Sequence, residues 1–196
     1  MPKKEKLKKV EGGVQFDVAH DEEKVYKKPK NSLAMFFYGR ADYDQIKADI
    51  EKIKEIFPEF YLETKVIKKK NGSYELIQDY IKDGKAIDLD LNKKVHNKLL
   101  EIRQKNRILI KNYGKSFDFL GNTGNMAALK SLLSGKTEEI TISNIMVING
   151  ELKIIDLDLL DIRFSEDSYN PFHVVTDWVS YKMSDYFLKR VFGLKI

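Results

Sequence analysis

Residues 144–158 read NIMVINGELKIIDLD, and this stretch organises the rest of the chain. Two apolar runs rich in β-branched residues flank Asn149 and Gly150, the strongest short-range signal for a tight hairpin, because both turn positions need a positive φ. Asn144 opens the first predicted strand and Asp156 closes the second. Antiparallel pairing should bring their side chains together at one edge of the hairpin. An amide oxygen and a carboxylate held there form a hard-oxygen site that Mg²⁺ accepts, with water and phosphate oxygens as further ligands.

Two more acids follow the hairpin. Asp158 projects to the same side of an extended strand as Asp156 and is expected to add a metal ligand. Asp161 is assigned to a solvated loop. The alternative to a metal site is a buried hairpin that happens to begin with Asn and end with Asp.

The composition is that of a globular protein. The 196 residues are 42% apolar and 33% charged, enough for one large domain or a small two-lobed one. No apolar run approaches the length of a transmembrane helix, and residues 1–6 lack the apolar core of a signal peptide. The lack of cysteine excludes disulfides and thiolate metal sites and suits a reducing cytosol. We therefore expect a cytoplasmic protein without a membrane span.

The net charge of +5 calls for a comparison with nucleic-acid-binding proteins. The Lys-rich runs are interspersed with acids and follow no recognised nucleic-acid motif. A polyanion such as ATP or RNA is compatible with this charge, but a solvated surface explains it better. Nucleic acid stays open as a partner and is not favoured.

The N-terminal part is predicted to form antiparallel strands and one helix. The apolar period over residues 42–57 predicts a helix, which Pro58 ends. Asn71 and Gly72 predict the turn of a second hairpin. The strands are expected at residues 7–10, 14–18, 24–27, 61–68 and 73–81.

These patterns resemble the protein-kinase-like superfamily. Residues 144–158 are similar to the family segment N-I-x-V…K-I-I-D-F-G, whose Asn and Asp hold the metals on ATP, although the triplet here is Asp-Leu-Asp. The resemblance implies an α+β, two-lobed fold with ATP and Mg²⁺ as cofactors. Residues 1–81 would be an N-lobe with a small antiparallel sheet and one helix. Residues 82–196 would be a trimmed, mostly helical C-lobe.

The resemblance also implies contacts between the N-lobe and the nucleotide. A strand, a glycine turn and a strand with Val-x-Lys place Gly12 and Gly13 over the phosphates and Lys27 on the α and β phosphates. Only two glycines of the family's G-x-G-x-x-G form are present. Asp49 takes the place of the helix acid that pairs with this lysine, because it borders the apolar stripe of its helix.

Residues 74–84 resemble the fifth strand and the hinge of the family. In that family the adenine edge pairs with the hinge backbone. The resemblance therefore implies the Asp79 carbonyl and the Ile81 N–H as partners of the base, with Gln78 in the gatekeeper position behind it.

This sequence departs most from the family at the catalytic triplet. Counting back from Asn144, residues 137–139 read TEE where H-R-D-x-x-x-x-N has its His-Arg-Asp. Glu139 is therefore the candidate general base, and Asp156 is the catalytic metal-binding acid. Asp118 is another acid that could fold into the cleft, and it ranks below Glu139 because the sequence gives no distance for it.

The C-terminal segment carries one further similarity. Residues 176–180 faintly resemble the family's S-D-x-W-S helix motif, whose Asp, here Asp177, braces the catalytic-loop backbone. No Ala-Pro-Glu follows, and little chain is left for the helices that hold protein substrates. Small-molecule and lipopolysaccharide-type kinases tolerate such trimming better than ordinary protein kinases.

Four functions follow from these patterns. The first is an atypical ATP- and Mg²⁺-dependent phosphotransferase whose acceptor, a small molecule or a protein, is unknown. The alternative is a pseudokinase that acts as a nucleotide-binding or regulatory module. A third hypothesis uses Asp156 and Asp158 as the two-metal acids of a nucleotidyl- or glycosyltransferase, and a fourth is a basic RNA binder. The first explains the largest part of the chain.

Overall fold

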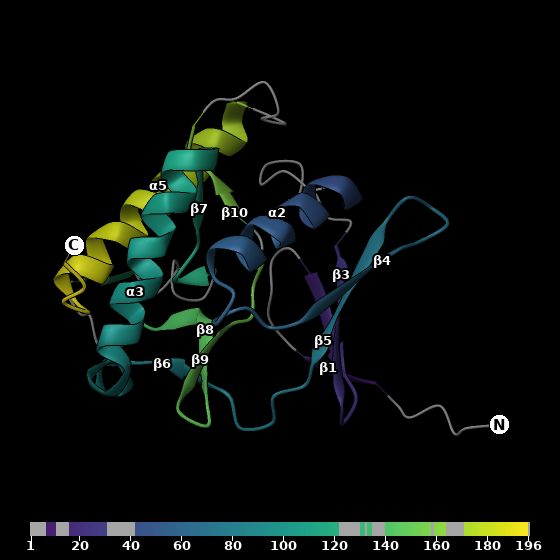
Figure 1. Ribbon diagram of the computed structural model, residues 1–196, viewed down its shortest axis with the longest axis horizontal. Coiled ribbons are helices and arrows are strands. Elements are labelled where there is room, and N and C mark those ends of the chain that lie inside the picture. The colour runs from purple at the N-terminus through teal and green to yellow at the C-terminus, as the bar shows by residue number, and fades with distance from the viewer. Residues whose placement is uncertain are drawn as a thin grey trace.

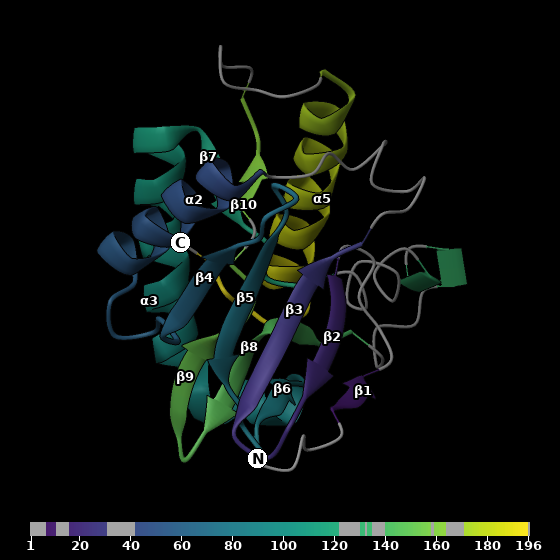
Figure 2. The same cartoon turned by 90° about the vertical axis from the view of Figure 1, so that its right-hand side faces the viewer.

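A five-stranded antiparallel sheet is built from the N-terminal part of the chain (Figures 1 and 2). The computed structural model describes residues 7–10, 16–30, 42–121, 130–131, 133–134, 140–157, 159–163 and 171–195. The sheet follows the order β1-β2-β3-β5-β4. Its strands are β1 (Lys8–Val10), β2 (Phe16–His20), β3 (Lys24–Pro29), β4 (Thr64–Lys68) and β5 (Tyr74–Asp79).

The hairpin of β4 and β5 confirms the turn predicted at Asn71 and Gly72, where Gly72 has a φ of 79°. Strand β3 lies in the middle of the sheet between β2 and β5. Lys27 therefore has Val18 on one side and Leu76 on the other. This central place holds the backbone of Lys27 rigidly.

The predicted first helix is confirmed as α2 (Tyr43–Ile56). A capping box starts it: the Asp42 carboxylate accepts from the Gln45 N–H at 2.8 Å, and the Gln45 side chain accepts from the Asp42 N–H at 3.0 Å. These bonds satisfy amide groups that lack an intrahelical partner. The helix buries three isoleucines at the predicted period, Ile46, Ile50 and Ile53.

The organising hairpin is also confirmed. Strand β8 (Ile142–Ile148) pairs with β9 (Glu151–Ile154) through a two-residue turn in which Asn149 has φ 50° and Gly150 has φ 80°. Both turn residues adopt the left-handed conformation that the Asn-Gly pair predicts. On its other edge β8 pairs with β6 (Lys85–Ile87), which completes a three-stranded sheet.

Two long helices lie away from the large sheet and are joined by the ion pair of Arg103 and Asp185 (Figure 1). They are α3 (Leu89–Tyr113) and α5 (Pro171–Arg190). A small sheet of β7 (Lys115–Phe117) and β10 (Leu159–Asp161) lies beside them, with β7 against α3 and β10 against α5. Within the described residues the chain is thus an α+β protein with three helices and three antiparallel sheets.

One continuous core joins these parts. Buried side chains of the large sheet and α2 pack in the same cluster as those of α3, the hairpin and α5. Phe57 is fully buried, and its ring centroid lies 6.3 Å from that of Phe117 in β7. Burial of this apolar surface is the main favourable term in folding.

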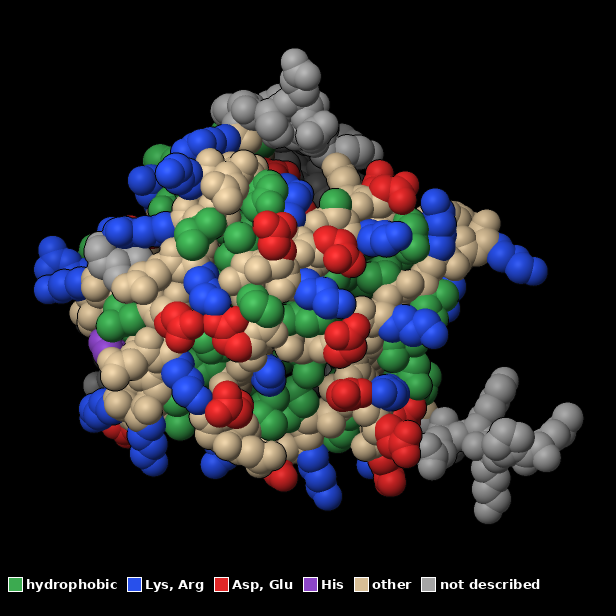
Figure 3. All heavy atoms as spheres, viewed as in Figure 1, with side chains coloured by type: hydrophobic (Ala, Val, Ile, Leu, Met, Phe, Trp, Pro, Cys, Tyr) green, Lys and Arg blue, Asp and Glu red, His purple; other side chains and the backbone are tan. Residues whose placement is uncertain are grey.

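None of the helices in the described part of the chain is apolar over a length sufficient to span a bilayer. On the face seen in Figure 3, Lys and Arg side chains are interspersed with Asp and Glu. On that face the positive charge does not gather into a uniform patch, as the mixed sequence runs predict.

Candidate functional site

Asn144 is held where the hairpin meets the segment after β7. Its side-chain Nδ2 donates to the Asp118 carbonyl at 2.9 Å. Its backbone carbonyl accepts from the Ile155 N–H at 3.0 Å. The residue is only 9% exposed. Both contacts fix the orientation of the amide and leave its Oδ1 to face the neighbouring loop.

Asp156 lies at the same end of the hairpin but one residue out of register with Asn144. Ile145 pairs with Ile154, so Asn144 lies opposite Ile155. Strand β9 ends at Ile154, so strand alternation does not set the direction of the Asp156 side chain. This carboxylate is half-buried and has no hydrogen bond or ion pair with any described residue. No described residue therefore competes with a cation for its two oxygens.

Lys27 reaches this place from the large sheet. Its Nζ donates to the Ile155 carbonyl at 2.6 Å across 128 residues of sequence. Ile155 thus receives Lys27 on its carbonyl, donates its N–H to Asn144 and directly precedes Asp156. The Lys27 ammonium and the Asn144 backbone thus both bind Ile155, and the next residue, Asp156, has a carboxylate without a partner among the described residues.

The structure gives Asp118 a place that the sequence did not reveal. Its Oδ1 accepts from the N–H groups of Leu120 at 3.2 Å and Gly121 at 3.1 Å, and its carbonyl accepts from Asn144. Asp118 therefore belongs to the same cluster as Asn144. The one local signal was an acid that directly follows a strand and precedes a glycine.

The pair expected between Asp49 and Lys27 is not formed. The buried Asp49 carboxylate binds Lys52 at 3.0 Å and Lys115 at 3.2 Å, one on each oxygen. Lys115 also binds Asp161 at 2.9 Å. Burial lowers the pKa of Lys115, but the two carboxylates outweigh burial and raise it. Asp49 thus joins α2 to β7, because Lys115 lies closer to it in the fold than Lys27.

The residues that the resemblance assigns to adenine binding lie in β5 and just after it. Gln78 is buried, and its Nε2 donates to Thr64 Oγ1 at 2.9 Å. Asp79 forms a surface ion pair with Lys24. Ile81 makes no hydrogen bond with a described residue, which leaves its N–H available.

Several of the predicted site residues cannot be placed. Gly12, Gly13, Glu139 and Asp158 lie outside the described residues. Their predicted roles stay predictions.

Asp177 of α5 binds the backbone of strand β10. It is 7% exposed, and its Oδ2 accepts from the Asp161 N–H at 2.7 Å. The pKa of Asp177 is raised to about 7, mainly by burial and also by the charges of Asp161 and Asp118, while the Asp161 N–H and Lys115 act to lower it. Asp177 therefore braces the backbone of β10.

The described part of the chain contains no group of three or more acidic, His or Cys side chains that could hold a metal ion. A divalent cation here would need Asn144 and Asp156 together with water or phosphate oxygens. Mg²⁺ is commonly held in this way, by one or two protein oxygens and the phosphates of a substrate.

Comparison of the chain with models of protein families, with curated proteins and with solved structures found no match. Within the described residues the chain is an α+β protein in which Lys27 and the Asn144 backbone bind Ile155, directly before Asp156.

Gly121 offers a test of how tightly Asn144 is held. A Cβ on Gly121 would lie 2.5 Å from Asn144 Oδ1 and 2.6 Å from Ser143 Oγ, and its φ is 64°. We expect Gly121→Ala to lower the free energy of unfolding by roughly 2–4 kcal/mol, from backbone strain and overpacking together. The matched control is Gly150→Ala, with φ 80° and open space around it, which should cost only about 1 kcal/mol. Equal losses in urea denaturation would show that Asn144 is not confined.

Proposed function

We propose that this protein is an atypical ATP- and Mg²⁺-dependent phosphotransferase with a two-lobed, protein-kinase-like arrangement. Residues 1–81 would form the nucleotide-binding lobe and residues 82–196 the lobe that carries the metal hairpin. The observation that carries the proposal is that Lys27 and Asn144 both bind the backbone of Ile155, the residue directly before Asp156.

Lys27 would bind the phosphates of ATP. A lysine ammonium has three N–H donors, and only one of those on Lys27 is engaged among the described residues, on the Ile155 carbonyl. The other two can donate to phosphate oxygens. The positive charge then lies beside the segment that leads into Asp156.

Asn144 and Asp156 would hold the metal. Asn144 contributes Oδ1, since its Nδ2 is used by Asp118, and Asp156 contributes a carboxylate that has no partner among the described residues. When bound, Mg²⁺ would neutralise charge on the transferred phosphoryl group. The protein's own work is to position the phosphates between Lys27 and this end of the hairpin.

The general base would be Asp118 or Glu139. The base takes the proton of the acceptor hydroxyl as that oxygen bonds to the phosphorus and the bond to the leaving phosphate breaks. Asp118 is favoured by its hydrogen bond to Asn144 and by the two amide groups that orient its carboxylate. The acceptor is a hydroxyl of a small molecule or of a protein.

A pseudokinase is the second candidate, and one observation favours it. The ion pair between the strand lysine and the helix acid is absent, because Asp49 is occupied by Lys52 and Lys115. Such a protein would bind the nucleotide without turnover.

Thermal unfolding with Mg²⁺ and a non-hydrolysable ATP analogue tests nucleotide binding. Saturation at about one hundred times Kd stabilises the native state by about 2.7 kcal/mol, which for a chain of this size raises Tm by roughly 5–10 °C. Lys27→Met should lose most of this rise. The control is Lys28→Met, because adjacent strand residues point to opposite faces and Lys28 pairs with Glu75 at 3.4 Å. No rise in the wild type, or equal rises in both variants, would contradict the proposal.

A further inference from the structure

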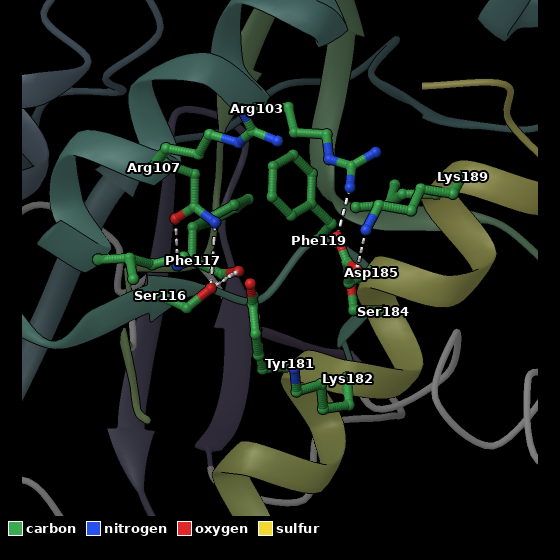
Figure 4. Close-up of a pocket in the computed structure, with 13 residues that line it drawn as sticks. Arg103, Arg107, Ser116, Phe117, Phe119, Tyr181, Lys182, Ser184, Asp185 and Lys189 are labelled. Atoms are coloured by element: carbon green, nitrogen blue, oxygen red, sulfur yellow. Dashed lines mark hydrogen bonds and ion pairs between the residues drawn. The ribbon is translucent and has the colours of Figure 1, made fainter. Parts of the chain in front are cut away.

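A cavity lies between α3, β7 and α5, away from the cluster around Ile155 (Figure 4). Its volume is about 190 Å³. Phe117 and Phe119 line it, whereas Asp118 between them does not, so the cavity and the proposed active site lie on different sides of this segment. The remaining polar wall comes from the two long helices.

Buried donors without partners lie in this wall. Arg103 is 5% exposed and Ser184 is 3% exposed, and both line the cavity. Arg103 Nη1 and Ser184 Oγ have no hydrogen-bond partner among the described residues. Leaving a buried donor unsatisfied is costly, and more so when it is charged. An acceptor is therefore missing on the cavity side of these two residues.

The cavity is also short of negative charge. Four cations line it, Arg103, Arg107, Lys182 and Lys189, against one carboxylate, Asp185. Asp185 is shared, because one oxygen pairs with Arg103 and the other accepts from Lys189 at 2.6 Å. Figure 4 shows both partners converging on Asp185. The formal charge of the lining is then 4 − 1 = +3.

The cavity is lined by buried residues at its inner end and by charged, exposed residues at its opening. Arg103, Ser116 and Ser184 are buried, whereas Lys182 and Lys189 are exposed. Burial lowers the pKa of the Arg103 guanidinium, while Asp185 only partly offsets this cost. An arginine stays charged in proteins, so a further anion in the cavity would be attracted to this guanidinium.

We propose that this cavity is a binding site for a phosphate group. A tetrahedral oxyanion accepts from Arg103 and Ser184 at the inner end and from Arg107 and Lys182 at the opening. Guanidinium groups match the geometry of phosphate oxygens, and such charge-assisted bonds are about twice as strong as neutral ones. The volume is small for a drug-sized ligand, which suits inorganic phosphate or the phosphate end of a small phosphomonoester.

The site is independent of the proposed catalysis, since none of Lys27, Asn144 and Asp156 lines it.

Titration calorimetry in Mg²⁺-free buffer tests phosphate binding in the cavity, with inorganic phosphate and glycerol 2-phosphate as separate probes and sodium chloride at matched ionic strength as the blank. Saturable binding of either probe supports the site. Tighter binding of the ester would identify a phosphorylated small molecule as its ligand, and tighter binding of phosphate would identify the free ion.

Arg107→Gln should weaken binding by about tenfold, the effect of losing one hydrogen bond from a charged group. The control is Arg190→Gln, which makes the same change at an exposed position of α5 outside the cavity lining. It should change the affinity less than about twofold, since only a distant screened charge is lost. Backbone amide signals of Arg103 and Ser184 should shift with phosphate and not with chloride. No binding above the chloride blank, or equal losses in both variants, would overturn the proposal.

Discussion

Replacement of Asp118 by Asn is expected to lower the rate of phosphoryl transfer by about 10²–10⁴-fold while leaving the binding of Mg²⁺ and ATP within about threefold. The asparagine Oδ1 can still accept from the Leu120 and Gly121 N–H groups, so the turn survives. The Asp118 carbonyl that holds Asn144 is unchanged as well. The variant therefore removes the carboxylate and keeps these hydrogen bonds.

The measurement is release of ADP in the presence and absence of candidate acceptors, with Glu139→Gln as the control. If Asp118 is the base, Glu139→Gln keeps most of the activity. The opposite pattern would assign the base to Glu139. A wild type that binds the nucleotide but shows no turnover above the Asp118→Asn background would contradict the phosphotransferase and support the pseudokinase.

Asp177 is expected to contribute to the free energy of unfolding an amount that falls as the pH rises from about 4 to about 7. Its pKa is raised from 3.8 to about 7 in the folded state. Between these values the folded protein binds a proton that the unfolded chain has released, so raising the pH favours unfolding. Each pKa unit corresponds to about 1.4 kcal/mol, which makes the contribution a few kcal/mol.

Asp177→Asn should remove this dependence and be more stable than the wild type at pH 8. Its amide oxygen can still accept from the Asp161 N–H, and it carries no charge beside Asp161 and Asp118. The positive charge of Lys115 favours the ionised form of Asp177. The asparagine loses this attraction, which limits the gain in stability.

Urea denaturation of both proteins between pH 4 and pH 8 measures the effect. Asp90→Asn is the matched control, because Asp90 is an exposed acid on α3 whose pKa is lowered by its hydrogen bond with Lys93. It should leave the slope between pH 4 and pH 7 nearly unchanged. An Asp177→Asn variant with the same slope as the wild type would show that Asp177 is ionised in the folded protein.

The local structure of the chain was predictable because near neighbours determine it. Asn149 and Gly150 adopt the positive φ values that their hairpin requires. The helix of residues 42–57 begins at its capping residue Asp42 and buries its apolar stripe. The same local patterns placed Asn144 and Asp156 at one end of the hairpin.

The partners of the site residues were not predictable in this way. Asp49 was expected to bind Lys27 but binds Lys115, 66 residues away, because the packing of α2 on β7 brings that lysine closer. Asp118 was ranked below Glu139, yet it meets Asn144 across 26 residues through its backbone carbonyl. Every residue has a backbone carbonyl, so the identity of residue 118 gives no sign that its carbonyl binds Asn144.

By itself the sequence determined the turns, the helix ends and the apolar faces of this protein, since these depend on φ preferences, capping and periodicity within a few residues. Only the tertiary structure decided that Lys27 reaches Ile155 and that Arg103 and Ser184 share a cavity between α3 and α5. Long side chains select their partners after the elements have packed, and that packing is a property of the whole core.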